Sequence, residues 1–398
     1  MRSERYRWVL ACNLFAILTV SSGLGFYNLS VYMHALAAQR GFSVASISSA
    51  VGLFFLTGGV AGLVTGRLLQ RRDARLVMIV GTLFSAAAIA CIGLVRSEWQ
   101  LFMVYGLFGV GYTGISVLPA TTLITRWFDP ARRPVALSFS STGLSLGGVI
   151  LTPLSAALLE RWPIEQATPL LGAIFALFIA PIVWFGVRSF PEAHPNDAPS
   201  SMRQGTAFAL AVRSRFFVLL TLGYVLAMGA QVGTIAHMYT RGVAVATPLQ
   251  ASFAVSVLAM MSVIGRLIGG FIIGRVSIKK FALATVLGQL LGFVVIGAAE
   301  NAMQLWLGAG LFGFTVGNLL MLQPLMLAQA FGVMDYPKIY SLSQAVSTLG
   351  IASGPVVLGA ITATNGYLTA FLTFAALSGV AFALIVAAGP VPEGEPAR

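Results

Sequence analysis

The sequence predicts an all-α integral membrane protein of twelve transmembrane helices, arranged as two six-helix halves. Three observations predict this fold class: few charged residues, twelve long apolar runs and an internal repeat. Asp, Glu, Lys and Arg make up 9% of the 398 residues, against about 25% in a typical soluble domain, and apolar residues make up 58%. Because a soluble protein needs more charged residues than this to cover its surface, the composition excludes a soluble fold.

Each apolar run is long enough to cross a bilayer core of about 30 Å, which takes roughly 20 helical residues. The runs lie approximately at 8–34, 45–66, 76–95, 99–126, 135–159, 168–187, 215–240, 247–274, 281–299, 303–331, 339–363 and 367–388. The first run is too long for a signal-peptide core and is expected to remain in the protein. A polar, proline-containing segment separates the sixth run from the seventh. We therefore predict a six-helix bundle over 1–187, a cytoplasmic linker over 188–214 and a second six-helix bundle over 215–398.

Basic residues in the loops predict the orientation, because Lys and Arg concentrate on the cytoplasmic side of a membrane. With the N-terminus inside, the inner segments hold seventeen of these residues and the outer loops four, once the helix-boundary Arg126 and the terminal Arg398 are set aside. Both termini are therefore expected in the cytoplasm, and the protein in the inner (cytoplasmic) membrane. The same clustering between apolar runs argues against nucleic acid as a partner, in spite of the net charge of +12.

Segments of the first six predicted helices recur in the last six, in the same order. The helices at 45–66 and 247–274 end in similar glycine patterns followed by arginine and a basic pair, and those at 99–126 and 303–331 share Gly-Leu-Phe-Gly. The matching segments are 58–67 with 266–275, Arg71-Arg72 with Lys279-Lys280, and 106–109 with 310–313. Two parallel six-helix halves joined by a polar loop fit the major facilitator architecture, in which the substrate site lies near mid-membrane.

The loop after the second predicted helix resembles the conserved loop motif of the major facilitator superfamily. Gly62, Gly66, Arg67 and Arg71 carry the resemblance. The sequence departs from the motif at Gly66, where the family usually has Asp, and glycine has no side chain to make the contact of that Asp. The resemblance implies that these residues, which we call the loop motif, take part in conformational change.

The segment 126–148 resembles the region leading into the fifth helix of monocarboxylate transporters and of bacterial oxalate/formate-antiporter-like proteins. It contains the basic pair Arg132-Arg133, followed by a run of small residues with glycines. The resemblance implies a secondary active transporter that works by alternating access, with Arg132 and Arg133 taking part in the conformational change together with the loop motif. Its expected substrate is a small organic anion, in particular a monocarboxylate, moved by proton symport or anion exchange.

Arg266 is the charged residue that the sequence places in the middle of a span. At 1.5 Å per residue it lies about 13 Å from Arg275, which is expected at the cytoplasmic interface. A charge at this depth costs about 2.5–3.5 kcal/mol, and no Asp or Glu lies within any predicted span. A carboxylate matches the forked donors of arginine. We therefore predict that Arg266 binds the substrate, which agrees with the resemblance, since an arginine at this place in the family binds the substrate carboxylate.

Two differences from the resembled families bear on coupling. The animal monocarboxylate carriers have an Asp four residues before the arginine, where this sequence has Ser262. The oxalate exchangers have a lysine inside the eleventh helix, and the segment 341–362 has none. One buried cation rather than two favours a monoanion over a dianion.

Other polar and aromatic residues within the predicted spans are candidates for contact with the substrate. The expected set is Tyr27, Asn28, Tyr112, Asn318, Gln323 and Gln344. For each, the alternative is a hydrogen bond between helices or a place in an interfacial aromatic belt. Tyr27 and Tyr112 are favoured by the resemblance, because the family uses tyrosines of the first and fourth helices. His237 is a candidate for proton coupling, and the alternative is a solvated histidine near the outer mouth.

Other functional classes fit the sequence less well. An enzyme would need clustered His, Asp, Glu or Cys within the spans, and only His34 and His237 come near, so we expect no catalytic, metal or cofactor site. A sensor that no longer transports would be expected to carry an extra soluble domain. The nearer alternative is an exporter of drugs or other lipophilic compounds, although such a protein would usually have a buried carboxylate. The expected partners are the lipid bilayer, the anion and a proton or counter-anion, with the protein as a monomer.

Overall fold

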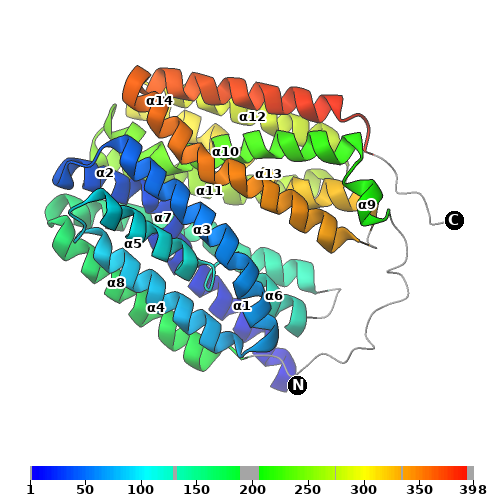
Figure 1. Ribbon diagram of the computed structural model, residues 1–398, viewed down its shortest axis with the longest axis horizontal. Coiled ribbons are helices and arrows are strands. Elements are labelled where there is room, and N and C mark those ends of the chain that lie inside the picture. Colours follow the sequence, from blue (N-terminus) through cyan, green and yellow to red (C-terminus); the bar gives the residue numbers. More distant parts are fainter. Residues whose placement is uncertain (1, 129–131, 189–205, 274, 333–334, 392–398) are drawn as a thin grey trace. The chain divides into compact units, whose positions relative to one another are not determined.

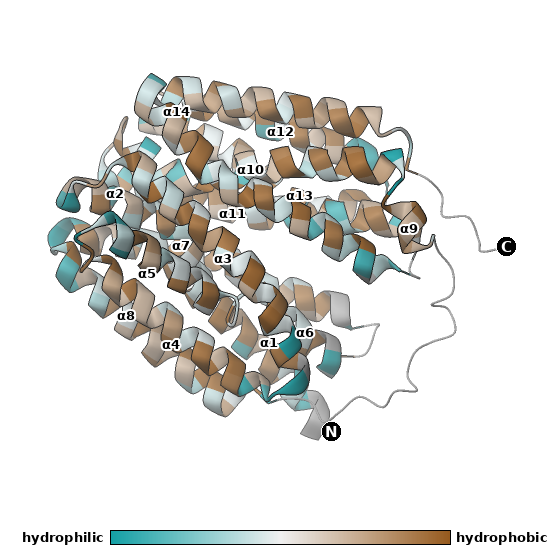
Figure 2. Ribbon diagram, viewed as in Figure 1, coloured by the Kyte–Doolittle hydropathy of each residue, from teal (hydrophilic) through white to brown (hydrophobic). Residues whose placement is uncertain are grey.

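The structure, a computed structural model, describes residues 2–128, 132–188, 206–273, 275–332 and 335–391. All secondary-structure elements within these residues are helices (Figure 1). They are α1 (Arg2–Ser21), the π-helix η1 (Ser22–Tyr27), α2 (Leu29–Arg40), α3 (Val44–Arg71), α4 (Ala74–Ile92), α5 (Glu98–Tyr112), α6 (Val117–Trp127), α7 (Arg133–Arg161), α8 (Ile164–Pro181), the π-helix η2 (Ile182–Gly186), α9 (Phe208–Ala211), α10 (Arg215–Val243), α11 (Pro248–Ile273), α12 (Ile278–Ala298), α13 (Ala302–Phe331) and α14 (Tyr336–Ala387). Figure 2 shows apolar residues along the helices and hydrophilic ones gathered at many helix ends.

The described residues contain eleven helices that are long and apolar enough to cross a membrane. The last of them, Lys338–Ala387, has 50 residues, or about 75 Å of helix, more than twice the thickness of a bilayer core. At Gly366 the backbone takes a φ of 79°, and Figure 1 shows α14 turning back there as an orange leg and a red leg. Counted as two crossings, α14 completes the twelve, and the predicted all-α membrane fold is confirmed.

Besides the π-helix η2 at the end of the sixth span, two spans have an interruption in their interior that the sequence did not predict. The first span passes from α1 to α2 through the π-helix η1, and the fourth is broken between α5 and α6. A short π-helical stretch leaves the regular hydrogen-bonding register of a helix and frequently lies at a functional site. Both breaks fall at candidate residues, since Tyr27 ends η1 and Tyr112 ends α5.

The chain divides into two compact units. The first unit contains residues 1–193 and 235–260, and the second contains 194–234 and 261–398. Helices α10 and α11 therefore each contribute one end to the first unit and the other end to the second. The predicted bundle boundaries at 187 and 215 stay predictions, and residues 189–205 of the predicted linker lie outside the described residues.

Close contact between helix backbones holds the first unit together. A Cβ atom added to Gly147 of α7 would collide with the Thr19 carbonyl of α1 and the Gly23 amide of η1, and one added to Gly143 would collide with the Phe15 carbonyl. Small residues let transmembrane helices approach closely, and van der Waals contact then stabilises the pair. The glycines of α7 thereby position η1, and with it Tyr27.

In the second unit, the core lies between α10, α12, α13 and α14. Its fully buried side chains include Tyr224, Leu319 and Ile339. The short helix α9, which lies within the predicted linker, contributes Ala211 to the same core. The described end of the linker is therefore part of the second unit.

Asp335 anchors α9. One carboxylate oxygen accepts a hydrogen bond of 3.0 Å from the Phe208 amide, and the other lies 3.0 Å from Lys338 Nζ. The Phe208 N–H first, and then Lys338, hold the pKa of Asp335 below its ordinary value. A group with a lowered pKa stabilises the folded state above its ordinary pKa, about 3.9 for Asp, and the contribution disappears as the pH falls through the lowered value.

We expect the Asp335→Asn variant to weaken this anchor at neutral pH, because an amide oxygen accepts a weaker hydrogen bond than a carboxylate and does not attract Lys338. Protonation of Asp335 in strong acid should weaken the anchor of the unchanged protein in the same way. Hydrogen exchange of the Phe208 amide should be faster in the variant than in the unchanged protein at neutral pH. Exchange rates measured in acid are corrected for the intrinsic effect of pH before they are compared. Asp73→Asn is the matched control, because Asp73 accepts a hydrogen bond from the Arg75 amide at the start of α4. Unchanged exchange at Phe208 in Asp335→Asn would contradict the anchoring role.

Candidate functional site

In the first unit, the π-helix η1 brings together two of the predicted site residues. The ring of Tyr112 packs against Gly25, where an added Cβ would lie 2.7 Å from the ring edge. Tyr27 is 4% exposed, and its ring covers Gly148 of α7. Because neither glycine has a side chain, the Tyr112 ring can pack against η1 at Gly25, and the ring of Tyr27, the last residue of η1, can pack against α7 at Gly148.

Asn28, at the junction between η1 and α2, is completely buried. Its side chain lies beside the Tyr32 hydroxyl, but neither its oxygen nor its nitrogen makes a hydrogen bond of good geometry with a described residue. The hydroxyl of Tyr32, one turn further along, donates to the carbonyl of Leu24 at 3.0 Å. Leaving a buried polar group unsatisfied costs about 1–3 kcal/mol, and such a group calls for an explanation. A polar ligand is one explanation, so Asn28 stays a candidate for substrate contact.

In the second unit, Arg266 lies on α11 where this helix touches α13. The residue is half-buried and has an interaction of its own. A Cβ added to Gly317 of α13 would lie 3.2 Å from the Cβ of Arg266 and 3.1 Å from the Ser262 hydroxyl. The missing side chain at Gly317 therefore lets α13 pass close to Arg266. Ser262 is 1% exposed, and its hydroxyl has no hydrogen-bond partner in the described part of the chain.

Asn318 lies one residue beyond Gly317 and is fully buried. Its amide nitrogen donates to the Phe314 carbonyl at 2.9 Å, and its oxygen packs against Gly269 of α11. That oxygen accepts no hydrogen bond from any described residue. The structure thus brings Arg266, Ser262 and Asn318 to one contact between α11 and α13.

Two other candidates of the second unit differ from Asn318. The amide nitrogen of Gln323 donates to Ser343 at 2.9 Å and to Ser347 at 3.1 Å, so it joins α13 to α14. The predicted alternative, a hydrogen bond between helices, therefore describes Gln323. Gln344 is half-buried on α14, and its backbone carbonyl accepts a hydrogen bond from the Thr348 hydroxyl. A role of either residue in substrate contact stays a prediction.

His237 is completely buried on α10, not solvated as the sequence suggested for a position near the outer mouth. Its Nε2 lies 3.0 Å from the hydroxyl of Ser48 on α3, and that hydroxyl donates to the Val44 carbonyl at 2.6 Å. Because the hydroxyl has one hydrogen and uses it on Val44, the network assigns a hydrogen to Nε2 of His237. His237 thus joins α10 to α3 in the first unit, and a part in coupling stays a prediction.

The loop motif lies at the end of α3. Arg67 and Arg71 are exposed, and a Cβ added at Gly62 or Gly66 would meet nothing within 4 Å. Packing in this structure therefore does not require glycine at either position. Arg132 is exposed, and the side chain of Arg133 lies outside what the structure describes. The roles of these residues in conformational change stay predictions.

The sequence did not predict a contact that joins the end of α3 to α6. Arg126 donates a hydrogen bond of 3.0 Å to the Leu69 carbonyl. Its place at a helix boundary between two basic clusters left Arg126 without an expected role. The structure makes it the link between the two segments that resemble the transporter motifs.

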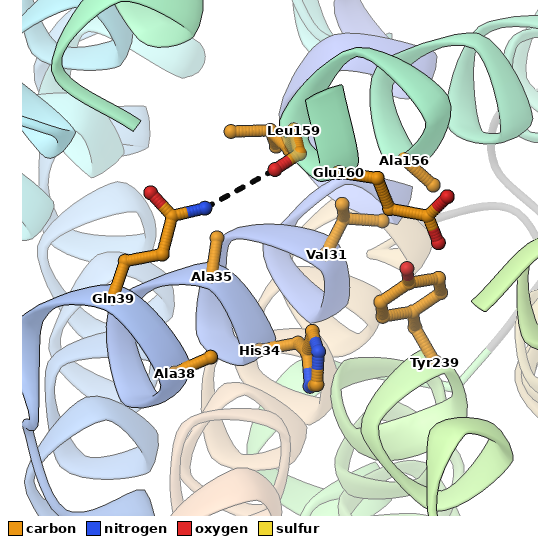
Figure 3. A pocket seen from close by; sticks show the side chains of 9 residues that line it. All are labelled: Val31, His34, Ala35, Ala38, Gln39, Ala156, Leu159, Glu160 and Tyr239. Atoms are coloured by element: carbon orange, nitrogen blue, oxygen red, sulfur yellow. Dashed lines mark hydrogen bonds between the residues drawn. The ribbon is translucent and has the colours of Figure 1, made fainter. Parts of the chain in front are cut away.

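The first unit also contains a cavity of about 160 Å³ that the sequence did not predict (Figure 3). It is lined by Val31, His34, Ala35, Ala38, Gln39, Ala156, Leu159, Glu160 and Tyr239, from α2, α7 and α10. The Gln39 amide closes one side, because its nitrogen donates to the Leu159 carbonyl at 3.1 Å and its oxygen accepts from the Ile164 amide at 2.7 Å. The described residues contain no group of three or more His, Cys, Asp or Glu that could hold a metal ion.

Comparison with known proteins connects these features to a family. The chain is similar to MFS-type transporter 1 from Ophiocordyceps sp. (strain BCC 1869), with 27% identity over 76% of this chain and 69% of the relative. It is also 27% identical to a hexuronate transporter from Bacillus subtilis (strain 168), over 41% of this chain and 37% of the relative.

The fold matches the crystal structure of a bacterial homolog of the human lysosomal transporter Spinster in an inward-facing and occupied conformation. The TM-score is 0.77 at 15% identity, and the match covers 96% of this chain and 97% of the other. The sequence model of the Major Facilitator Superfamily matches this chain over residues 15–299 and again over 244–398. These two matches span most of the sequence, and the chain therefore belongs to the Major Facilitator Superfamily of transporters, which are not enzymes.

Proposed function

We propose that this protein is a secondary active transporter of a small organic anion, in particular a monocarboxylate, with Arg266 as the anion-binding group. The observation that carries the proposal is a permanently charged guanidinium on a membrane-spanning helix, α11, whose contact with α13 is built from small residues. A guanidinium offers a carboxylate two parallel hydrogen bonds, and such charge-assisted bonds are strong where water is scarce.

The neighbours of Arg266 support the same ligand chemistry. The Ser262 hydroxyl can donate a hydrogen bond to an anion, and the oxygen of Asn318 can accept one from a hydroxyl substituent. In the first unit, Asn28, Tyr27 and Tyr112 are the corresponding candidates for contact with the substrate. The similarity to a hexuronate transporter is consistent with this proposal, since a hexuronate is a sugar acid with one carboxylate.

Transport is proposed to take place in the cytoplasmic membrane, with both termini inside and with a proton or a counter-anion as the coupled ion. An arginine within a membrane-spanning helix attracts anions and repels cations. We therefore favour an organic anion as the substrate over the lipophilic compounds that an exporter would carry. A screen of ligands distinguishes the organic-anion transporter from the exporter of lipophilic compounds.

We expect carboxylates to raise the unfolding temperature of the purified protein. The screen compares short-chain, keto, hydroxy and aromatic acids with their uncharged amides and with lipophilic cations. A true ligand at 100 times its Kd stabilises the folded state by about 2.7 kcal/mol, whereas the amide of the same acid should have little effect. Stabilisation by lipophilic cations and by none of the acids would overturn the proposal in favour of an exporter.

A further inference from the structure

The cavity lined by α2, α7 and α10 gathers three titratable side chains that the proposed anion site does not use. His34 comes from α2, Glu160 from α7 and Tyr239 from α10. The rings of His34 and Tyr239 meet edge to face with centroids 5.4 Å apart. Figure 3 shows the Tyr239 hydroxyl pointing toward the Glu160 carboxylate. An imidazole and a carboxylate thus share one cavity that is large enough for several water molecules.

Unsatisfied hydroxyls continue from this cavity along α7. Thr152 is 0% exposed and Ser155 is 1% exposed, and neither hydroxyl has a hydrogen-bond partner among the residues that the structure describes. Each lies four residues before a side chain that lines the cavity, Ala156 or Leu159, so they share its face of the helix. Buried hydroxyls in a helix commonly bond to a carbonyl of the preceding turn, and these two do not.

The first membrane span lies opposite these hydroxyls of α7. Val31 lines the cavity, and Tyr27 lies one turn before it. The Tyr27 ring packs on Gly148, which in turn lies one turn before Thr152. The two helices therefore run side by side from the cavity to Tyr27 and its neighbour Asn28, whose buried amide is also unsatisfied.

We propose that the cavity is a proton-binding site, in which His34 takes up a proton from the solution and the Glu160 carboxylate balances its charge. The hydroxyls of Ser155 and Thr152 can both donate and accept hydrogen bonds, and they hold water that connects this site to Asn28. Histidine is the side chain whose ordinary titration falls between about pH 5 and pH 8. The inference rests on the proposed transport function, because it names the proton as the coupled ion.

The other charged groups on the surrounding helices have different partners or positions. Arg40 of α2 pairs with Glu165 at 2.9 Å, and Arg161 of α7 is exposed. On α10, Arg241 is 6% exposed and has an interaction of its own, and His237 bonds to Ser48. The titratable side chains that line the cavity are thus those of His34, Glu160 and Tyr239.

Proton binding is tested by nitrogen NMR of the full chain in lipid nanodiscs, with its three histidines isotope-labelled. The resonance that disappears in His34→Gln identifies His34. It should titrate between about pH 5 and pH 8, and Glu160→Gln should move its curve toward acid, because an opposite charge is lost. Glu165→Gln, which removes a carboxylate outside the cavity, should leave the curve unchanged. A His34 that does not titrate, or an equal effect of the two glutamine variants, would overturn the proposal.

The water path is tested by thiol labelling in a background without Cys12 and Cys91. Thr152→Cys should react with a small hydrophilic thiol reagent about tenfold faster than Leu154→Cys, because only a hydrated thiol readily forms the reactive thiolate. Leu154 is the matched control on α7, since its side chain is 62% exposed on an apolar surface of the helix. Ser155→Cys repeats the test if Thr152→Cys does not fold. Equal labelling rates for Thr152→Cys and Leu154→Cys would exclude the water path. Neither the NMR titration nor the labelling uses a transported acid. A negative result in either experiment would therefore leave the proposed anion site unaffected.

Discussion

Replacing Arg266 by lysine is expected to lower uptake of the carried acid by about tenfold or more, with normal amounts of protein in the membrane. Lysine keeps the positive charge but replaces the planar fork of donors by a single ammonium, so the paired hydrogen bonds to a carboxylate are lost. A hydrogen bond to a charged group contributes about 1.5–3 kcal/mol, and each 1.4 kcal/mol corresponds to a tenfold change in affinity. The measurement is uptake into proteoliposomes, with the acid that stabilises the protein most in the ligand screen.

Two controls separate the anion site from general damage. Ser262→Ala removes a hydroxyl that has no partner in the described structure, so transport should fall much less than in Arg266→Lys. Arg275→Lys changes an exposed arginine near the end of the same apolar run, whose guanidinium stacks on Phe271 at 3.6 Å, and should leave uptake nearly unchanged. If Arg266→Ala moves carboxylates at the normal rate, Arg266 is not the anion-binding group.

The spans could be predicted from the sequence because the thickness of the bilayer fixes the length of an apolar helix. The run predicted at 303–331 is α13 (Ala302–Phe331), and the run at 215–240 is contained in α10 (Arg215–Val243). The π-helix Ser22–Tyr27 could not be predicted in this way. An apolar run indicates which residues lie in the membrane. A π-helix differs from an α-helix only in which backbone carbonyl each amide bonds to, and hydrophobicity does not determine this.

The sequence predicts a site residue when that residue is energetically unfavourable in a membrane whatever its neighbours are. Arg266 is conspicuous because a charge in an apolar run is unfavourable whatever surrounds it. Asn28 and Gln323 look equivalent in the sequence, since both are amides within a span. The structure separates them, because Gln323 donates to Ser343 and Ser347, while the buried amide of Asn28 makes no hydrogen bond of good geometry with a described residue.

The cavity could not be predicted, because its titratable groups come from three helices far apart in the chain. His34, Glu160 and Tyr239 have no common spacing, and each is unremarkable in its own helix. The same holds for Thr152 and Ser155, which resemble the many hydroxyls that bond within a helix. Only the packing of α7 against the first span shows that their hydrogen-bonding capacity is unused.

The contact between α10 and α14 in the second unit is expected to be highly sensitive to added volume. Each helix has two glycines four residues apart, Gly229 and Gly233 on α10 and Gly350 and Gly354 on α14. A Cβ at Gly233 would lie 2.7 Å from the Gly354 carbonyl oxygen, and one at Gly229 would lie 2.8 Å from that of Gly350. The edge of the Phe374 ring also lies close to Gly233, but the two carbonyl oxygens belong to the backbone, so a rotamer change cannot remove the collision with them.

We therefore expect Gly354→Ala to destabilise the folded protein by about 1–3 kcal/mol, the usual effect of overpacking, and to lower its unfolding temperature in lipid nanodiscs. Gly270→Ala is the matched control, because an added Cβ there meets nothing within 4 Å and alanine is the better helix former by about 0.5–1 kcal/mol. The two variants make the same chemical change in the same unit, so a difference between them reports the helix contact alone. Equal unfolding temperatures would mean that α10 and α14 can move apart at little cost, and the close packing of these glycines would then not stabilise the unit.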